Sequence, residues 1–217
     1  MKKLTRYFYI LLSIILFCVN CHGQDSTHFR CIPKDKLPKA VHYHSKTIAA
    51  IEWEDVEGDH IVILEETGYY RNPDLKHLSD GSDAELYAGH YCYNGVKKER
   101  IWNLEDYIYD CPVDMEVSYM KDMPLITDLD KNSIPEIWLI YQTVCHGDVS
   151  PLTVKIIMYE GKQKYAIRGQ SKVMEGIDEH GRTHYLGGTY TYDTAFANQP
   201  LFLNHAKTLW KQFVLNE

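Results

Sequence analysis

Short segments of alternating apolar and polar residues, separated by turn residues, constrain the fold of this 217-residue chain more than any other feature. Residues 47–53 alternate and residues 61–64 are all apolar, and the acidic stretch between them is typical of a turn that joins two strands. Residues 85–93 and 96–102 repeat the pattern. Asn94-Gly95 lies between them and predicts a two-residue hairpin turn, because both residue types tolerate positive φ. The sequence therefore predicts an antiparallel, mainly β protein.

The second half of the chain repeats this order. Strand-like segments occur at 123–127, 137–144, 154–159 and 164–168. At one offset of 75 residues, the aligned positions are Ile51, Asp55, Gly58 and Leu64 with Ile126, Asp130, Ser133 and Leu139. This alignment predicts an internal repeat of 47–103 and 123–169, with four strands per unit as in a propeller blade. Two units cannot close a propeller, so we expect an open or sandwiched β structure. A chance alignment of hairpins is the alternative.

The C-terminal segment changes to a helical period. Apolar residues recur every three or four positions from Leu201 to Phe213, which predicts an amphipathic helix that covers the sheet. Asn198 is the candidate N-cap, and Pro200 suits the first turn. The glycine-rich stretch 176–188 is typical of a loop or a hairpin.

The N-terminus has the features of a secretory signal peptide. Lys2, Lys3 and Arg6 precede an apolar run over residues 7–19. That run is shorter than the roughly 20 residues that a membrane-spanning helix needs. We expect residues 1–23 to be removed, which leaves 24–217 as a single β-rich domain that is exported to the periplasm or the cell exterior. Lipid anchoring through Cys18 or Cys21 is the alternative.

The charge of the remaining chain excludes one class of partner. Removal of residues 1–23 takes away three of the 23 Lys and Arg residues and none of the 30 Asp and Glu residues, so the formal charge becomes −10. Nucleic-acid-binding proteins neutralise phosphates with clustered basic residues. This acidity therefore argues against a nucleic-acid partner.

Four cysteines follow the predicted cleavage site, and an exported protein with an even number of cysteines is expected to form disulfides. Three pairings of these four cysteines are possible, and we favour a disulfide between Cys111 and Cys145, because each lies at the edge of a predicted ordered block beside the acidic loop at 128–136. This pairing leaves Cys31 with Cys92. The spacing contains no Cys-x-x-Cys pair, which argues against zinc or thioredoxin-type chemistry.

Residues 128–136 place oxygen ligands at alternating positions around a predicted turn. Asp128, Asp130 and Asn132 would supply side-chain oxygens, Ile134 a main-chain carbonyl and Glu136 the closing carboxylate. Ca²⁺ accepts such oxygen shells. The spacing predicts a structural calcium ion, since the protein fills every ligand position. An acidic turn in which Asp128 and Asn132 cap backbone amides is the alternative.

This loop resembles the calcium loops of FG-GAP-type β-propeller repeats, whose pattern is Asp-x-Asp-x-Asp/Asn-Gly-x-x-Asp/Glu. The resemblance covers nine residues and departs at Ser133, where the family has a glycine with positive φ. An EF-hand is excluded because Leu139 occupies the twelfth position. The companion loop contains Asp55 and Asp59, but Ile61 stands at its closing position, so we expect a solvated hairpin turn.

Two further groups are candidates for chemistry. His146, Asp148 and Ser150 fall within five residues on a predicted loop, which makes this a possible functional loop. A nucleophile needs a base within hydrogen-bonding reach, and spacing alone does not provide one. Pairs of acidic residues such as Glu52 and Glu54 are also compatible with glycoside hydrolysis, although nothing in their spacing selects a pair.

The aromatic residues are candidates for sugar binding. The chain contains 17 tyrosines and four tryptophans, and aromatic rings beside acidic residues form sugar-binding surfaces. Packing in a core or in cross-strand pairs is the alternative. The candidate tyrosines are Tyr69, Tyr70, Tyr91, Tyr93, Tyr190 and Tyr192.

Several short segments in the second half carry a resemblance to a known family. They are residues 126–132, 136–138, 145–151, 155–161 and 164–166. Together they are similar to a family of small exported bacterial proteins linked to surface polysaccharide biosynthesis. The resemblance implies a role in the cell envelope, and it brings no catalytic residues.

We therefore expect an exported envelope protein that acts by non-enzymatic binding of a surface glycan or of the machinery that assembles it. An exported inhibitor or scaffold that binds another protein is one alternative, and a glycan-processing enzyme is the other. A deep pocket with converging carboxylates would favour the enzyme, and an aromatic surface would favour glycan binding. A flat apolar edge strand would favour a protein partner.

Overall fold

The computed structural model describes residues 28–37, 45–95 and 97–215, so the predicted signal peptide and lipid-anchor cysteines lie outside the described residues. The first sheet has the order β1-β2-β3-β4-β5 and is antiparallel throughout. Its strands are β1 (Arg30–Cys31), β2 (Lys46–Asp55), β3 (Gly58–Glu66), β4 (Ser82–Tyr93) and β5 (Lys98–Cys111). A short 3₁₀ helix, η1 (Lys34–Lys36), follows β1.

The second sheet has the order β13-β10-β9-β8-β6, and β7 also pairs with β8. Its strands are β6 (Met115–Tyr119), β7 (Leu125–Thr127), β8 (Glu136–Cys145), β9 (Thr153–Glu160), β10 (Gln163–Gln170) and β13 (Tyr190–Tyr192). A separate hairpin, β11 (Lys172–Ile177) and β12 (Thr183–Gly187), occupies the stretch that the glycines marked as a loop or hairpin. A 3₁₀ helix, η2 (Thr194–Asn198), and the helix α1 (Pro200–Phe213) complete the chain.

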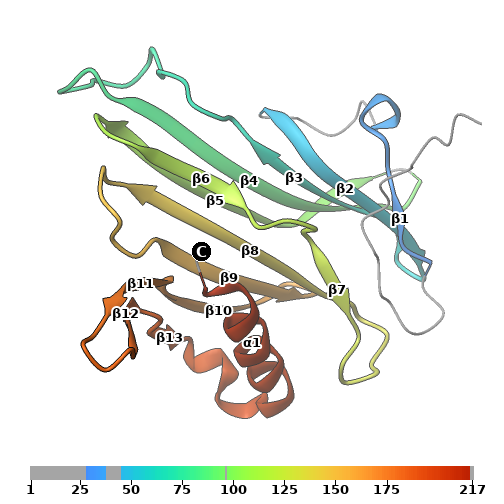
Figure 1. The fold of residues 1–217 in the computed structure, drawn as a ribbon. Coiled ribbons are helices and arrows are strands. Elements are labelled where there is room, and N and C mark those ends of the chain that lie inside the picture. Colours follow the sequence, from blue (N-terminus) through green and yellow to red (C-terminus); the bar gives the residue numbers. More distant parts are fainter. Residues whose placement is uncertain (1–27, 38–44, 96, 216–217) are drawn as a thin grey trace, which may run out of the picture.

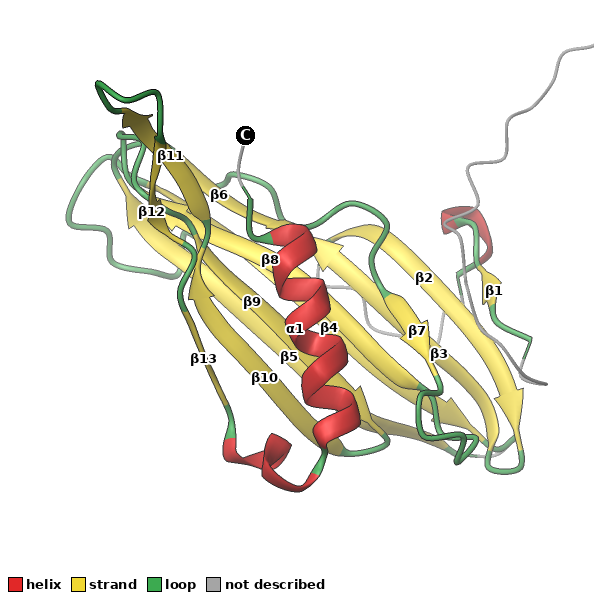
Figure 2. Ribbon diagram, turned by 60° about the horizontal axis from the view of Figure 1, so that its bottom comes forward, coloured by secondary structure: helices red, strands yellow, loops and turns green. Residues whose placement is uncertain are grey.

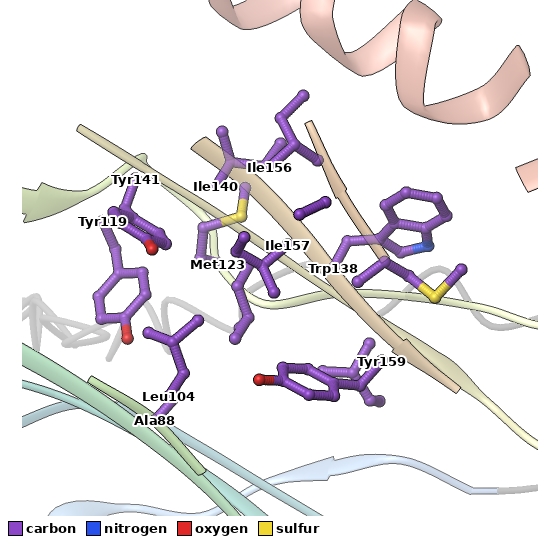
Figure 3. Close-up of a cluster of buried hydrophobic side chains, with 14 of the residues drawn as sticks. Ala88, Leu104, Tyr119, Met123, Trp138, Ile140, Tyr141, Ile156, Ile157 and Tyr159 are labelled. Carbon is purple, nitrogen blue, oxygen red and sulfur yellow. The ribbon is translucent and has the colours of Figure 1, made fainter. Parts of the chain in front are cut away.

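The molecule has three layers, in which the two sheets face each other and α1 covers the outer face of the second sheet (Figures 1 and 2). The main core contains residues from both sheets and from α1. Ala88 and Leu104 of the first sheet point toward Ile157 and Tyr159 of the second (Figure 3). The mainly β fold with a C-terminal helix is therefore confirmed.

Strand β8 lies at the centre of this arrangement, with both faces buried. The Tyr141 hydroxyl donates to Asp106 Oδ2 of β5 at 2.8 Å, whereas the Trp138 ring lies 4.9 Å from that of His205 on α1. A strand covered on both faces is apolar along its length rather than alternating. This explains the unbroken apolar run from Ile137 to Tyr141.

Helix α1 follows the predicted period, and its buried side chains are Phe202, Ala206, Leu209 and Trp210. Pro200 occupies the first turn as expected. The predicted N-cap at Asn198 is wrong, because Asn198 closes η2 and Gln199 takes the cap position, where its N–H donates to the Phe196 carbonyl at 3.0 Å. None of the helices in the described residues has the length and apolar composition needed to cross a membrane.

The β4–β5 connection is longer than predicted. Tyr93 pairs with Lys98, so four residues, 94–97, separate the strands instead of the expected Asn94-Gly95 turn. The Asn94 N–H donates to the Lys97 carbonyl at 3.3 Å, and the Lys97 N–H donates to Asn94 Oδ1 at 3.0 Å. Gly95 has φ of 81° within this loop. The asparagine side chain thus closes a wider turn than the dipeptide alone indicates.

The aligned halves of the chain take the same antiparallel order. Strands β2 to β5 pair consecutively in the first sheet, and β7 to β10 pair consecutively in the second. The β2–β3 connection and the β7–β8 connection occupy equivalent places in these two series. The internal repeat stays a prediction, because a shared strand order does not by itself establish duplication.

One of the two predicted disulfides is confirmed and the other is wrong. Cys111 at the end of β5 bonds to Cys145 at the end of β8, which joins the two sheets. Cys31 lies on the edge strand β1, while Cys92 is buried on β4, and strands β2 and β3 lie between them. Adjacent strands are about 4.8 Å apart, so this separation exceeds the reach of a disulfide.

Candidate functional site

An open cleft of about 730 Å³ lies between the sheets. Its rim consists of residues 54–57 at the end of β2 and in the β2–β3 turn, residues 132–135 before β8 and residues 161–162 in the β9–β10 turn. Strands β2, β3, β4, β5 and β9 supply its inner wall. A volume of several hundred Å³ is typical of sites for small molecules.

A row of aromatic rings forms the inner wall, one ring from each of five strands. Trp53 stacks on His60 with 4.9 Å between ring centroids, and His90 lies 5.0 Å from Trp53. Trp102 lies 5.6 Å from His90 and stacks on Tyr159, across the sheet interface, at 4.2 Å. The cross-strand pairs Trp53–His60 and His90–Trp102 create this row. Alternation along each strand then directs the paired side chains to the same face.

Two of these rings belong to a hydrogen-bonded relay. His60 Nε2 lies 3.0 Å from Asp55 Oδ1, and His60 Nδ1 lies 2.9 Å from His90 Nε2. A carboxylate only accepts, so His60 carries its proton on Nε2 and, when neutral, accepts from His90. Burial and the neighbouring His60 lower the pKa of His90 to about 3, which keeps this ring neutral near pH 7. His90 Nδ1 therefore carries a lone pair.

Three ring nitrogens at this wall are buried without a partner among the described residues. They are Trp53 Nε1, His90 Nδ1 and Trp102 Nε1. Each parent side chain is at most 6 % exposed. An unsatisfied buried polar group costs about 1–3 kcal/mol of folding free energy, so the lack of a partner at each of these three nitrogens needs an explanation.

Of the four tryptophans, the two away from the cleft have hydrogen-bond partners and the two that line it have none among the described residues. Trp138 Nε1 donates to Thr127 Oγ1 at 2.8 Å, and Trp210 Nε1 donates to the Gly188 carbonyl at 3.3 Å, both away from the cleft. The two indoles without partners are the two that line it. Among the described residues, the unsatisfied indole donors are thus confined to the cleft.

The Asp128 loop, residues 128–136, contributes to the cleft rim through residues 132–135. Ligand oxygens of Asp128, Asp130 and Glu136 lie within 4.8 Å of one another, as the sequence predicts. Glu160, which the sequence analysis missed, joins them through Asn132, whose Nδ2 donates to Glu160 Oε1 at 2.7 Å. Glu160 ends β9 and pairs with Glu136 in register, and a pairing between strands of this kind cannot be predicted from the sequence alone.

One of the predicted ligands, Asn132, has another role. Asn132 Oδ1 accepts from the Ile134 N–H at 2.7 Å, and the Asn132 backbone N–H donates to Asp128 Oδ1 at 3.0 Å. These are the bonds of the capped acidic turn that was the alternative to calcium. The Ile134 side chain is exposed. The structure therefore brings three predicted carboxylates together and uses Asn132 to brace the turn.

The electrostatics of the Asp128 loop suit a cation. Burial raises the pKa of Glu136, although hydrogen bonds from Thr127 Oγ1 and the Leu129 N–H partly offset the effect. Burial also raises the pKa of Glu160, and the charges of the two loop aspartates add to the rise. These carboxylates repel one another, and hard oxygen donors of this kind match the preference of Ca²⁺.

Ser133 has the backbone that the FG-GAP glycine would adopt, with φ of 66°. A left-handed conformation is unfavourable for a residue with a Cβ. We expect Ser133→Gly to raise the free energy of unfolding by about 0.5–1 kcal/mol, as measured by urea denaturation. Ser133→Ala is the matched control and should bring no such gain, because alanine keeps the strained φ. Equal effects of the two substitutions would contradict this account.

The candidate loop at 145–151 is a braced turn. Asp148 accepts from the Ser150 N–H at 3.0 Å and lies 3.1 Å from His146 Nδ1. Hydrogen bonds from the backbone and side chain of Ser150 lower the pKa of Asp148. A nucleophilic serine needs histidine as its direct partner, and here aspartate stands between the two. The arrangement therefore holds the turn and does not activate Ser150.

The six candidate tyrosines do not form this site, since Tyr159 is the tyrosine that lines the cleft. Tyr70 donates to the buried Glu85 carboxylate, and Tyr69 donates to the Met115 carbonyl. Tyr91 belongs to a second small core on the outer face of the first sheet. Packing, which was the alternative, accounts for Tyr91, whereas Tyr69 and Tyr192 are exposed and lie outside the cleft.

We compared the chain with protein-family models, with curated protein sequences and with solved structures, and none of the three comparisons found a match. The geometry of the cleft and of the Asp128 loop therefore carries the functional argument.

Proposed function

We propose that this chain is an exported cell-envelope protein that binds an envelope glycan in the inter-sheet cleft without altering it chemically. The observation that carries the proposal is the cleft itself, which combines aromatic walls with ring nitrogens that have no protein partner. Sugars present both apolar faces and hydroxyl groups, and they match such a surface. The resemblance to envelope proteins linked to polysaccharide biosynthesis supports the same conclusion.

The location of the protein follows from the predicted signal peptide. Cleavage after Gly23 would release the chain into the periplasm or the cell exterior, and a lipid anchor would instead retain it at the membrane. In either place it would meet envelope glycans or the proteins that assemble them. The disulfide between Cys111 and Cys145 is of the kind that persists in such an oxidising compartment.

We also propose that the Asp128 loop holds a structural Ca²⁺ ion. Asp128, Asp130 and Glu136 would bind it, and Glu160 contacts the same turn through its hydrogen bond from Asn132. The protein fills these positions from one turn and one neighbouring strand, which suits a structural ion better than a catalytic one. Bound calcium would fix residues 132–135 where they line the cleft.

Blocking the mouth of the cleft tests the proposed function. Val56 is fully exposed on the rim, so Val56→Trp adds bulk there at little cost to folding. We expect this substitution to weaken binding of surface polysaccharide, purified from the cells that encode the chain, by about tenfold or about 1.4 kcal/mol in calorimetry. Val149→Trp is the matched control on the opposite end of β9, and it should bind normally.

Three outcomes would contradict non-enzymatic glycan binding at this site. Equal affinity of both valine variants and the wild type would place binding elsewhere. Release of new reducing ends from the polysaccharide by the wild type would identify a glycan-processing enzyme instead. Binding to envelope proteins but to no polysaccharide would favour the scaffold or inhibitor alternative.

A further inference from the structure

The unsatisfied nitrogens of the cleft specify which kind of ligand it accepts. We propose that the ligand is an uncharged saccharide whose oxygens accept hydrogen bonds from Trp53 Nε1 and Trp102 Nε1 and whose hydroxyl donates to His90 Nδ1. This inference rests on the proposed function, because it assumes that the cleft is the binding site. It specifies whether the protein or the ligand donates each hydrogen bond, and it specifies the charge of the ligand.

The two indole N–H groups determine where the ligand must accept hydrogen bonds. An indole N–H only donates, so each of these nitrogens requires an acceptor oxygen. Both side chains are at least 94 % buried and line the cleft, and neither nitrogen has an acceptor within the described residues. Hydroxyl, ring and acetamido oxygens of a saccharide all satisfy this requirement.

The hydrogen-bonded series Asp55, His60 and His90 determines where the ligand must donate a hydrogen bond. Asp55 fixes the proton of His60 on Nε2, and His60 Nδ1 then accepts a hydrogen bond from the N–H of His90 Nε2. His90 Nδ1 is left as an acceptor, which calls for a hydroxyl or amide N–H on the ligand. A ligand that both accepts and donates over a short distance is typical of carbohydrate and excludes a purely apolar molecule.

The acidic residues of the cleft rim indicate which charge the ligand can carry. Glu54, Asp55 and Glu57 line it, and Lys162 pairs with Glu99 at 2.9 Å. An anionic sugar would meet these carboxylates at close range, and like charges repel most strongly where water is excluded. A cationic amino sugar would suit the rim but would face the N–H groups of the two indoles with its ammonium donors. An uncharged saccharide satisfies both regions.

The wild-type chain, residues 24–217 with its disulfide, provides the test, with the four indole N–H signals followed by ¹⁵N NMR. Cellobiose and N,N′-diacetylchitobiose are the uncharged probes, chitobiose is the cationic probe and digalacturonate is the anionic probe. We expect an uncharged probe to shift the signals of Trp53 and Trp102. Trp138 and Trp210 are internal controls whose signals should stay in place, because their donors already have partners.

Affinity supplies a second readout. Trp102→Phe keeps a ring against Tyr159 but removes the N–H, and we expect it to weaken binding of the uncharged probe about three- to tenfold, the effect of one hydrogen bond. Trp210→Phe removes a donor far from the cleft and should leave the affinity unchanged. A Trp102→Phe variant that fails to fold leaves the wild-type spectra as the deciding measurement.

The possible failures separate the two proposals. Binding of an uncharged probe without shifts of the Trp53 and Trp102 signals would overturn this inference but leave glycan binding in place. Tighter binding of chitobiose or digalacturonate than of both uncharged probes would do the same. No binding of these probes or of the purified surface polysaccharide would overturn the proposed function as well.

Discussion

Removal of the Cys111–Cys145 disulfide should lower the free energy of unfolding by about 4 kcal/mol, because this bond closes a loop with a sequence separation of 34 residues. The bond joins the end of β5 in one sheet to the end of β8 in the other, so its loss also releases the sheets from each other in the unfolded chain. For a protein of this size we expect the melting temperature to fall by roughly 8–16 °C. Calorimetry of the double variant Cys111→Ala/Cys145→Ala measures both quantities.

Two comparisons show whether the disulfide is the cause. Cys92→Ala removes a buried thiol outside this disulfide and should cost only about 1 kcal/mol, the size of a small core truncation. A reductant should lower the melting temperature of the wild type and leave that of the double variant unchanged. Peptide mapping that joins Cys92 to Cys31, or a double variant as stable as the wild type, would refute the assignment.

Calcium should raise the melting temperature of the wild type by about 5–10 °C. An ion at a hundred times its dissociation constant stabilises the folded state by about 2.7 kcal/mol, which sets the size of this shift. The physical reason is that the ion relieves the repulsion among Asp128, Asp130 and Glu136, whose ligand oxygens lie within 4.8 Å of one another. Thermal melts in 1 mM Ca²⁺ and in excess EGTA measure the effect.

The matched variants make this prediction specific. Asp130→Ala should abolish the response to calcium, since it removes a central ligand. Glu179→Ala removes a carboxylate that is 87 % exposed in the β11–β12 turn, and its calcium response should equal that of the wild type. Identical melts of the wild type in calcium and in chelator would show that the loop is a capped turn without an ion.

Local periodicity predicted much of the fold correctly. The alternation at 47–53 became β2, the apolar run at 61–64 became β3, and the three- and four-residue spacing after Pro200 became α1. The periods of β2 and α1 reflect one buried and one exposed face, whereas the run in β3 is apolar throughout because both of its faces are buried. The Asn94-Gly95 turn was wrong in length, because the Asn94 side chain bonds to Lys97 and holds the chain open by two further residues.

The aromatic wall of the cleft could not be predicted from the sequence. Its rings come from positions as distant as Trp53 and Tyr159, and they meet only because of strand register and the packing of one sheet on the other. A register shift between His90 and Tyr91 further changes which residue of β4 opposes Trp102. Single-sequence patterns carry no information on such long-range pairing. The Asp128 loop was predictable because its residues are contiguous.

The shared position of the Asp128 loop has a thermodynamic consequence. Its carboxylates gather on one side, while residues 132–135 of the same nine-residue turn form part of the cleft rim. An ion that orders this turn and a ligand that contacts the rim would therefore act on one element. By linkage, each would change the dissociation constant of the other by the same factor. Calcium concentration outside the cell would then set how tightly the protein holds its glycan.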